Sequence, residues 1–294
     1  MFESFKRSWE ITKTSVNVLL LDKELLLFPI FAGIFSTIFF VAMIFPFIIS
    51  GIVSSLVGES LGTILSYVAI FVLYLGLAFI ATFFNVCVVY TIKKRFEGGN
   101  ATFFESLGFG FSKLKLIFAW SIVSATVGLV LNILNNVAEK LGPVGKIIMN
   151  ITVSVLGGVW GIITIFVVPA MVYDNVGPLT AIKNSVETLK KTWGESLIRY
   201  VGLGLVQLVI FLGILFVGII FSIILLLVLP LLGIIMFLVT LVLLILVVLI
   251  FTLLNTVFNT ALFVYAKTGT VPQGYNPELM KSAFKQKEQK KGLF

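Results

Sequence analysis

The residue types that most often carry chemistry are scarce in this sequence of 294 residues. It contains no histidine, which removes the commonest general base and the commonest metal ligand. It contains one cysteine, Cys87, so neither an internal disulfide nor a metal cluster held by cysteines can form. The carboxylates that an enzyme acting on lipid would use, such as Asp22, Glu24 and Asp174, stand where helix caps and turns are expected. We therefore predict no catalytic residue, no metal site and no cofactor.

Polar but uncharged side chains within apolar stretches are the remaining candidates for a binding site. Asn85, Asn255 and Asn259 are of this kind, and the last two share a helix face because they are four residues apart. They could line a path or hold the headgroup of a substrate. The commoner role of such residues is hydrogen bonding between helices, which contributes about 0.6 kcal/mol each on average.

Other residues predict packing and anchoring. Gly157 and Gly161 have the spacing of small residues that lets two membrane helices approach closely. Trp9, Trp120 and Trp193 are predicted to anchor the chain at the membrane surface, because tryptophan favours the headgroup level.

The composition indicates where these residues must lie. Hydrophobic residues make up 59% of the chain and charged residues 12%, and the mean hydropathy is +1.15. Soluble proteins average about 45–50% apolar and about 25% charged residues. The stretch 200–266 contains no Asp, Glu, Lys or Arg at all. Charges in the middle of a bilayer cost roughly 2.5–3.5 kcal/mol each, so this pattern is typical of an integral membrane protein.

About six helices are predicted to span the membrane, since a bilayer core of about 30 Å needs roughly 20 apolar residues. Residues 229–230, a Leu-Pro step, are the best place for a turn in the long apolar run, because proline disfavours helix at the residue before it. A re-entrant segment near Pro230 is the alternative. The predicted spans are residues 26–50, 64–92, 116–136, 147–172, 200–228 and 232–266.

The distribution of basic residues predicts the orientation. Alternate connections between these spans hold 19 of the 21 Lys and Arg residues, and cytoplasmic loops are the ones enriched in Lys and Arg. We therefore expect a multi-pass protein of the cell membrane with both termini in the cytoplasm. The net charge of +8 then serves topology and attraction to anionic lipid headgroups, which are the predicted partners beside the bilayer itself. Nucleic-acid binding is not expected, and the sequence indicates no particular oligomeric state.

Three cytoplasmic segments share an amphipathic rhythm with apolar residues three and four apart, and each precedes a pair of spans. The predicted fold is therefore all-α, a polytopic membrane bundle built from three copies of an interfacial helix followed by a transmembrane hairpin. One membrane domain is expected over residues 1–270, with repeats at about 1–95, 96–177 and 178–270. Residues 271–294 form a basic tail that is expected to be disordered. The apolar positions are Phe2, Phe5, Trp9, Thr12, Val16 and Leu19, then Phe104, Leu107, Phe111, Leu114 and Phe118, then Leu179, Ile182, Val186, Leu189 and Trp193.

Several stretches resemble a prokaryotic family of integral membrane proteins known as a domain of unknown function. They are residues 5–15, residues 20–29 with the sequence LLDKELLLFP, the segment RFEGG at 95–99, and residues 167–195. The likeness extends over about residues 1–270 and implies a prokaryotic cytoplasmic membrane, with no activity to carry over. The repeated helix and hairpin is also similar, in architecture alone, to the membrane domain of some glycerophosphodiester phosphodiesterases, whose catalytic barrel has no counterpart in this sequence.

Three functions remain in order of preference. The first is a non-enzymatic membrane protein that organises the membrane or assembles partners. The second is a transporter or channel for a neutral or amphipathic solute or a lipid, which would use Asn85, Asn255 and Asn259. The third is an enzyme acting on lipid.

Overall fold

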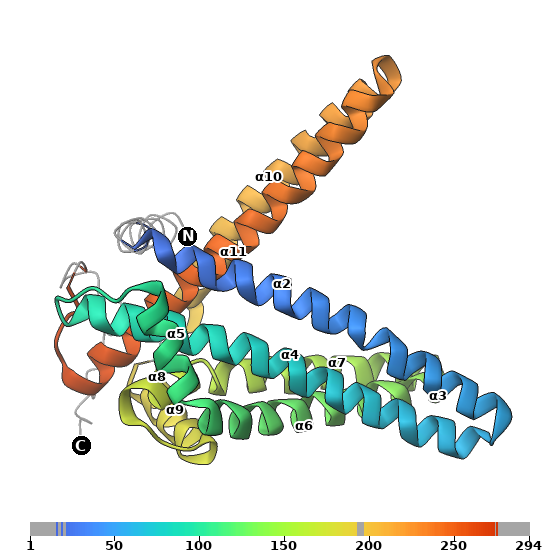
Figure 1. Ribbon diagram of the computed structural model, residues 1–294, viewed down its shortest axis with the longest axis horizontal. Coiled ribbons are helices and arrows are strands. Elements are labelled where there is room, and N and C mark those ends of the chain that lie inside the picture. The colour runs from blue at the N-terminus through green and yellow to red at the C-terminus, as the bar shows by residue number, and fades with distance from the viewer. Residues whose placement is uncertain (1–15, 17–18, 20–21, 193–196, 274, 276–294) are drawn as a thin grey trace, which may run out of the picture. The chain divides into compact units, whose positions relative to one another are not determined.

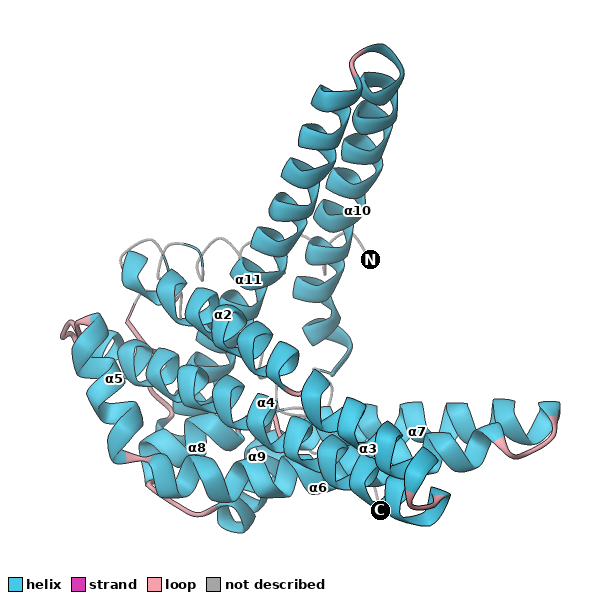
Figure 2. Ribbon diagram, turned by 45° about the vertical axis from the view of Figure 1, so that its right-hand side comes forward, coloured by secondary structure: helices cyan, strands magenta, loops and turns pink. Residues whose placement is uncertain are grey.

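The structure is a computed structural model. It describes residues 16, 19, 22–192, 197–273 and 275. The described residues form helices joined by short loops, without a strand (Figure 2). It forms two compact units, one of residues 28–94 and 100–189 and the other of residues 1–27, 95–99 and 190–294. Six helices of the described residues are long and apolar enough to cross a membrane. The prediction of about six spans in an all-α membrane protein is confirmed.

The first unit begins with two helices that together form the first candidate span. These are α2 (Leu27–Ala42) and α3 (Ile44–Leu56), which are interrupted at Met43 (Figure 1). Pro46 explains the interruption, because its ring would clash with the carbonyl of Ala42 and it has no N–H to donate. The long helix α4 (Glu59–Phe96) then runs back, after a tight turn in which Gly58 has φ of 139°.

The rest of the first unit contains two short helices and a second pair of spans. The short helix α5 (Phe103–Ser112) lies across α4 (Figures 1 and 2) and leads into α6 (Leu114–Glu139). The returning span consists of α7 (Pro143–Ile163) and α8 (Val167–Asp174), followed by α9 (Pro178–Thr192).

The fourth span is broken between α7 and α8, and proline again explains the break. Pro169 stands at the third position of α8, so a continuous helix would bring its ring against the carbonyl of Ile165. The break frees the N–H of Phe166, which donates to the hydroxyl of Ser185 on α9 at 3.1 Å. Both groups are fully buried. A side chain of α9 therefore accepts a hydrogen bond from a backbone N–H that would be costly to leave unpaired in apolar surroundings.

The second unit is dominated by a long hairpin of α10 (Leu197–Val228) and α11 (Pro230–Thr268), with Leu229 alone between them. The predicted turn at residues 229–230 is thus where the chain reverses, with proline at the first position of α11. The helices approach very closely: a Cβ at Gly218 would lie 2.3 Å from the Thr240 side chain. The short 3₁₀ helix η1 (Lys23–Leu26) packs against α11.

The predicted spans coincide with these helices, except that the first and fourth run across the breaks at Met43 and at 164–166. The helices extend a few residues beyond the predicted limits, and only α10 ends at the predicted residue, Val228. The predicted interfacial segments at 104–118 and 179–193 are helical in their described parts, as α5 with the start of α6 and as α9. The first predicted segment lies almost entirely outside the described residues. The single membrane domain over 1–270 and its internal repeat stay predictions.

Candidate binding site

An apolar pocket of about 390 Å³ lies among α2, α4, α5 and the first turn of α6, within the first unit. This volume is in the range of about 300–1,000 Å³ that is usual for small-ligand sites. No polar side chain lines it, and seven of its ten lining residues are phenylalanine. The lining residues are Phe31, Phe35, Phe79, Ile80, Phe83, Phe84, Phe103, Leu107, Phe111 and Leu114.

Helical spacing brings these side chains together. On α2 the two pocket residues are four apart, and on α5 the three pocket residues, Phe103, Leu107 and Phe111, follow one another at intervals of four. Residues at this spacing lie on one helix face. The rings also contact each other across helices: Phe103 lies 5.6 Å from Phe31, and Phe111 lies 5.0 Å from Phe83, measured between ring centroids. The pocket wall is therefore a connected set of rings.

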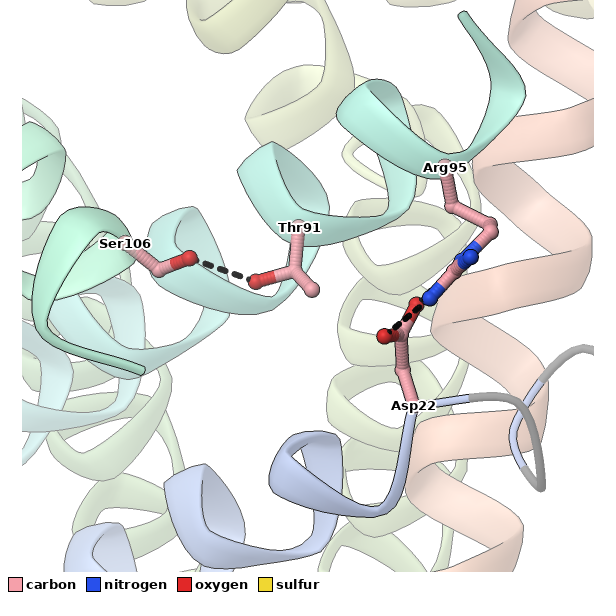
Figure 3. Close-up of polar contacts among 4 residues, drawn as sticks. All are labelled: Asp22, Thr91, Arg95 and Ser106. Carbon is pink, nitrogen blue, oxygen red and sulfur yellow. Dashed lines mark hydrogen bonds and ion pairs between the residues drawn. The ribbon is translucent and has the colours of Figure 1, made fainter. Parts of the chain in front are cut away.

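The helix α5 is held against α4 by a different face from the one that lines the pocket. The buried hydroxyls of Thr91 and Ser106 are 2.7 Å apart and form a hydrogen bond (Figure 3). One turn further along α5, a Cβ at Gly110 would lie 2.7 Å from the sulfur of Cys87 and 3.1 Å from the ring of Phe83. No larger residue than glycine fits there without movement, so Gly110 sets how closely α5 approaches α4.

The predicted polar candidates lie on helices of both units. Asn85 is half-buried on α4, next in sequence to the pocket residue Phe84, but it does not line the pocket. Asn255 and Asn259 are half-buried on α11, in the second unit. Their predicted roles in a path, in headgroup binding or in contacts between helices stay predictions.

The predicted packing and anchoring residues are placed as follows. A Cβ at Gly157 would meet a methyl group of Leu131 on α6 at 3.8 Å, whereas one at Gly161 would meet nothing within 4 Å. Trp120 is 7% exposed, and its ring stacks on that of Trp160 with centroids 5.8 Å apart. This is a packing contact between α6 and α7. Trp9 and Trp193 lie outside the described residues.

Two of the acidic candidates are engaged in contacts between chain segments. The carboxylate of Asp22, which is 7% exposed, forms a bidentate ion pair with the guanidinium of Arg95 (Figure 3). One of its two hydrogen bonds joins Nε to Oδ2 at 2.6 Å. In the other unit, Asp174 accepts a hydrogen bond of 3.0 Å from the amide of Asn184. Both carboxylates therefore join separate segments of the chain. Asp22 stands at the N-cap position of η1, as expected from the sequence, but its side chain makes no capping hydrogen bond.

The sequence of this chain matches a known protein family. The model of one family, described as a family of unknown function (DUF6159), matches residues 63–273. The chain belongs to DUF6159. The sequence resemblance to an uncharacterised family is thereby confirmed for most of the chain, including residues 95–99 and 167–195. No curated protein and no solved structure matches the chain.

The DUF6159 match covers most of the pocket. The pocket residues on α4, α5 and α6 fall within it, and the two on α2 precede it. Leu107, Phe111 and Leu114 belong to the apolar face predicted from the sequence, whereas the pocket itself was not predicted. The available signal was the phenylalanine content, 29 residues, together with the spacing of four on α2 and α4.

Proposed function

We propose that this protein is a non-enzymatic membrane protein that holds a lipid by one of its hydrocarbon chains. The phenylalanine pocket carries the proposal. Its lining offers no proton donor, no nucleophile and no metal ligand, so it supports binding of an apolar group and not a reaction. By holding a lipid at a fixed place, such a site would let the protein organise the membrane around it.

The size and depth of the pocket support a hydrocarbon chain as the occupant. A water-sized group takes up about 30 Å³, so 390 Å³ has room for roughly a dozen groups of methylene size. Phe83 lies ten residues before Lys93 on α4, which corresponds to about 15 Å along the helix axis. This depth falls within the predicted cytoplasmic half of the bilayer core, where lipid chains surround the protein.

Selectivity in such a pocket has to come from shape. Lipid tails are as apolar as the pocket, so exchanging one apolar environment for another gives no hydrophobic gain. Rigid aromatic walls can still favour one chain over bulk lipid, because each well-placed pair of carbon atoms gains about 0.1–0.2 kcal/mol of dispersion energy.

We propose the finer topology from the sequence: a cell-membrane location with both termini in the cytoplasm. The asymmetry of Lys and Arg supports it. A threefold internal repeat is proposed as well. Aligning the rhythm of α5 with that of α9 pairs Ser106 with Ala181 and Gly110 with Ser185, and all four residues are buried. Reporter fusions at each terminus test the orientation, and an active periplasmic reporter at either end would contradict it.

Crosslinking with a phospholipid that carries a photoreactive diazirine on its acyl chain tests the lipid site. The full-length protein is reconstituted with this lipid, irradiated and digested. We expect peptides covering 79–84 and 103–114 to be labelled above other lipid-exposed peptides. Filling the pocket by Ile80→Trp should lower that labelling several-fold. The matched control is Val68→Trp, on the same helix at a side chain 53% exposed and outside the pocket lining.

Labelling that follows exposed apolar surface evenly, or that is unchanged in Ile80→Trp, would contradict the lipid site. Liposomes that contain only this protein separate holding from transport. Movement of lipid or of a neutral solute that depends on the protein would favour the transporter hypothesis instead, and replacing Asn85, Asn255 and Asn259 by Leu would then test which residues carry it.

A further inference from the structure

Three lysines of the first unit are held over aromatic rings at the predicted cytoplasmic end of the helices. Lys94 lies over the ring of Tyr90, with its Nζ 5.8 Å from the ring centroid. Tyr90 stacks on Phe109 of α5 at 4.2 Å and 14°. Lys113, at the end of α5, lies over the other member of this stack, with its Nζ 5.2 Å from the Phe109 centroid.

The third lysine joins the same group through α8. The Nζ of Lys93 is 4.9 Å from the ring centroid of Tyr173, and the Nζ of Lys113 donates to the Oδ1 of Asn175 at 2.7 Å. Tyr173 and Asn175 are two residues apart at the end of α8. The ammonium groups of Lys93 and Lys113 therefore both reach residues 173–175. We call Lys93, Lys94, Lys113 and the rings of Tyr90, Phe109 and Tyr173 the lysine–aromatic cluster.

The three lysines of the cluster outnumber the two carboxylates, Glu105 and Asp174, that adjoin its aromatic residues. Among the described residues, no carboxylate forms an ion pair with any of its three lysines. Glu105 accepts a hydrogen bond from the hydroxyl of Tyr90 at 3.0 Å, and Asp174 accepts one from Asn184, and these two carboxylates offset part of the lysines' charge. Each lysine is only half-exposed, so its stem is packed and its ammonium is held in place.

We propose that the lysine–aromatic cluster binds a phosphate group that carries negative charge, supplied by the headgroup of an anionic lipid. Ammonium groups contribute to attraction toward anionic membrane surfaces, which face the cytoplasm. Rings that hold the lysines in place reduce the entropy lost when a ligand binds. This inference does not rest on the phenylalanine pocket, which is lined by a different face of α5. The same chemistry would accept a free phosphate compound, and the experiment distinguishes these sources.

The test measures lipid retention by native mass spectrometry of the full-length protein in detergent, with phosphatidylglycerol and phosphatidylcholine titrated in parallel. We expect the wild type to retain phosphatidylglycerol about tenfold more tightly than phosphatidylcholine. Lys93→Gln, Lys94→Gln and Lys113→Gln together should remove that preference. The same three positions changed to Arg should keep it, because arginine preserves both the charge and the contact with the rings.

A matched control changes the same charge elsewhere. Lys183, Lys190 and Lys191 of α9 are exposed lysines on the same predicted side, and their joint replacement by Gln should alter the preference by no more than about twofold. Inorganic phosphate is then added to the wild type. Retention that is unaffected identifies the lipid headgroup as the source, and displacement that requires the three cluster lysines identifies a free phosphate compound. A triple Gln variant that folds and keeps the wild-type preference overturns the proposal, as does a control variant that loses it equally.

Discussion

Replacing Gly110 by alanine should loosen the contact between α5 and α4. The new methyl carbon would lie 2.7 Å from the sulfur of Cys87 and 3.1 Å from the ring of Phe83, both closer than van der Waals contact allows. Overpacking of this kind costs about 1–3 kcal/mol. The hydrogen bond between Thr91 and Ser106 holds the same interface, so a displaced α5 would also strain it.

The chain contains its own probe for this contact. Cys87 is the single cysteine, and it is fully buried under Gly110. N-ethylmaleimide can modify its thiol when α5 moves away, so the labelling rate follows the population of the open state. Since about 1.4 kcal/mol corresponds to a factor of ten, a cost of 1–3 kcal/mol predicts labelling faster by about 5-fold to 150-fold. The assay uses purified protein in detergent, with mass spectrometry to count the modified fraction.

Gly108→Ala is the matched control, because a Cβ at Gly108 on the same helix would meet nothing within 4 Å. Its labelling rate should equal that of the wild type or fall slightly, since alanine favours helix over glycine by up to about 1 kcal/mol. Cys87→Ala serves as the blank. Equal rates for Gly110→Ala and the wild type, or equal increases for both glycine variants, would refute the view that Gly110 sets the approach of α5.

Three further predictions concern stability, measured as the midpoint of thermal unfolding in detergent. Asp22→Asn should lower stability by about 1.5–3 kcal/mol, because it removes the negative charge from the hydrogen-bonded pair with Arg95, and Arg95→Gln in the same chain should restore part of it. Ser185→Ala should cost about 1–3 kcal/mol by removing the buried hydroxyl that accepts the hydrogen bond from the Phe166 N–H, and an unchanged midpoint would contradict that contribution. Gly218→Ala should cost about 1–3 kcal/mol by forcing α10 away from Thr240, whereas the same change at Gly213, which has open space, should be neutral.

The span number and most helix limits could be predicted from the sequence because they follow from local composition. Apolar length identifies a span, and proline identifies a turn, as at residues 229–230. The breaks in the first and fourth spans were missed, although the information was local. Pro46 and Pro169 each stand four residues after the interrupted carbonyl, and the rule for proline in a helix applies to both.

The pocket and the lysine–aromatic cluster could not be predicted, because each depends on contacts between residues far apart in the sequence. Phe109 gives no sign in the sequence that it stacks on Tyr90 or that Lys113 reaches Asn175. Gly110 likewise has meaning only once Cys87 is known to lie opposite it. Helical periodicity in a single sequence shows which residues share a helix face, but it does not show which other residues that face contacts.

The one-residue connection between α10 and α11 has a consequence for how the chain enters the membrane during synthesis. The connection between α6 and α7 contains Lys140, and Lys146 follows in the first turn of α7, so the predicted topology requires the translocation machinery to carry charged side chains across the bilayer there. Leu229 carries no charge, and neither does any residue from 200 to 266. These two helices can therefore partition into lipid together as a closed pair, without a polar segment crossing first. If either helix were too short to span the bilayer, the basic C-terminal tail would no longer be held on the predicted cytoplasmic side.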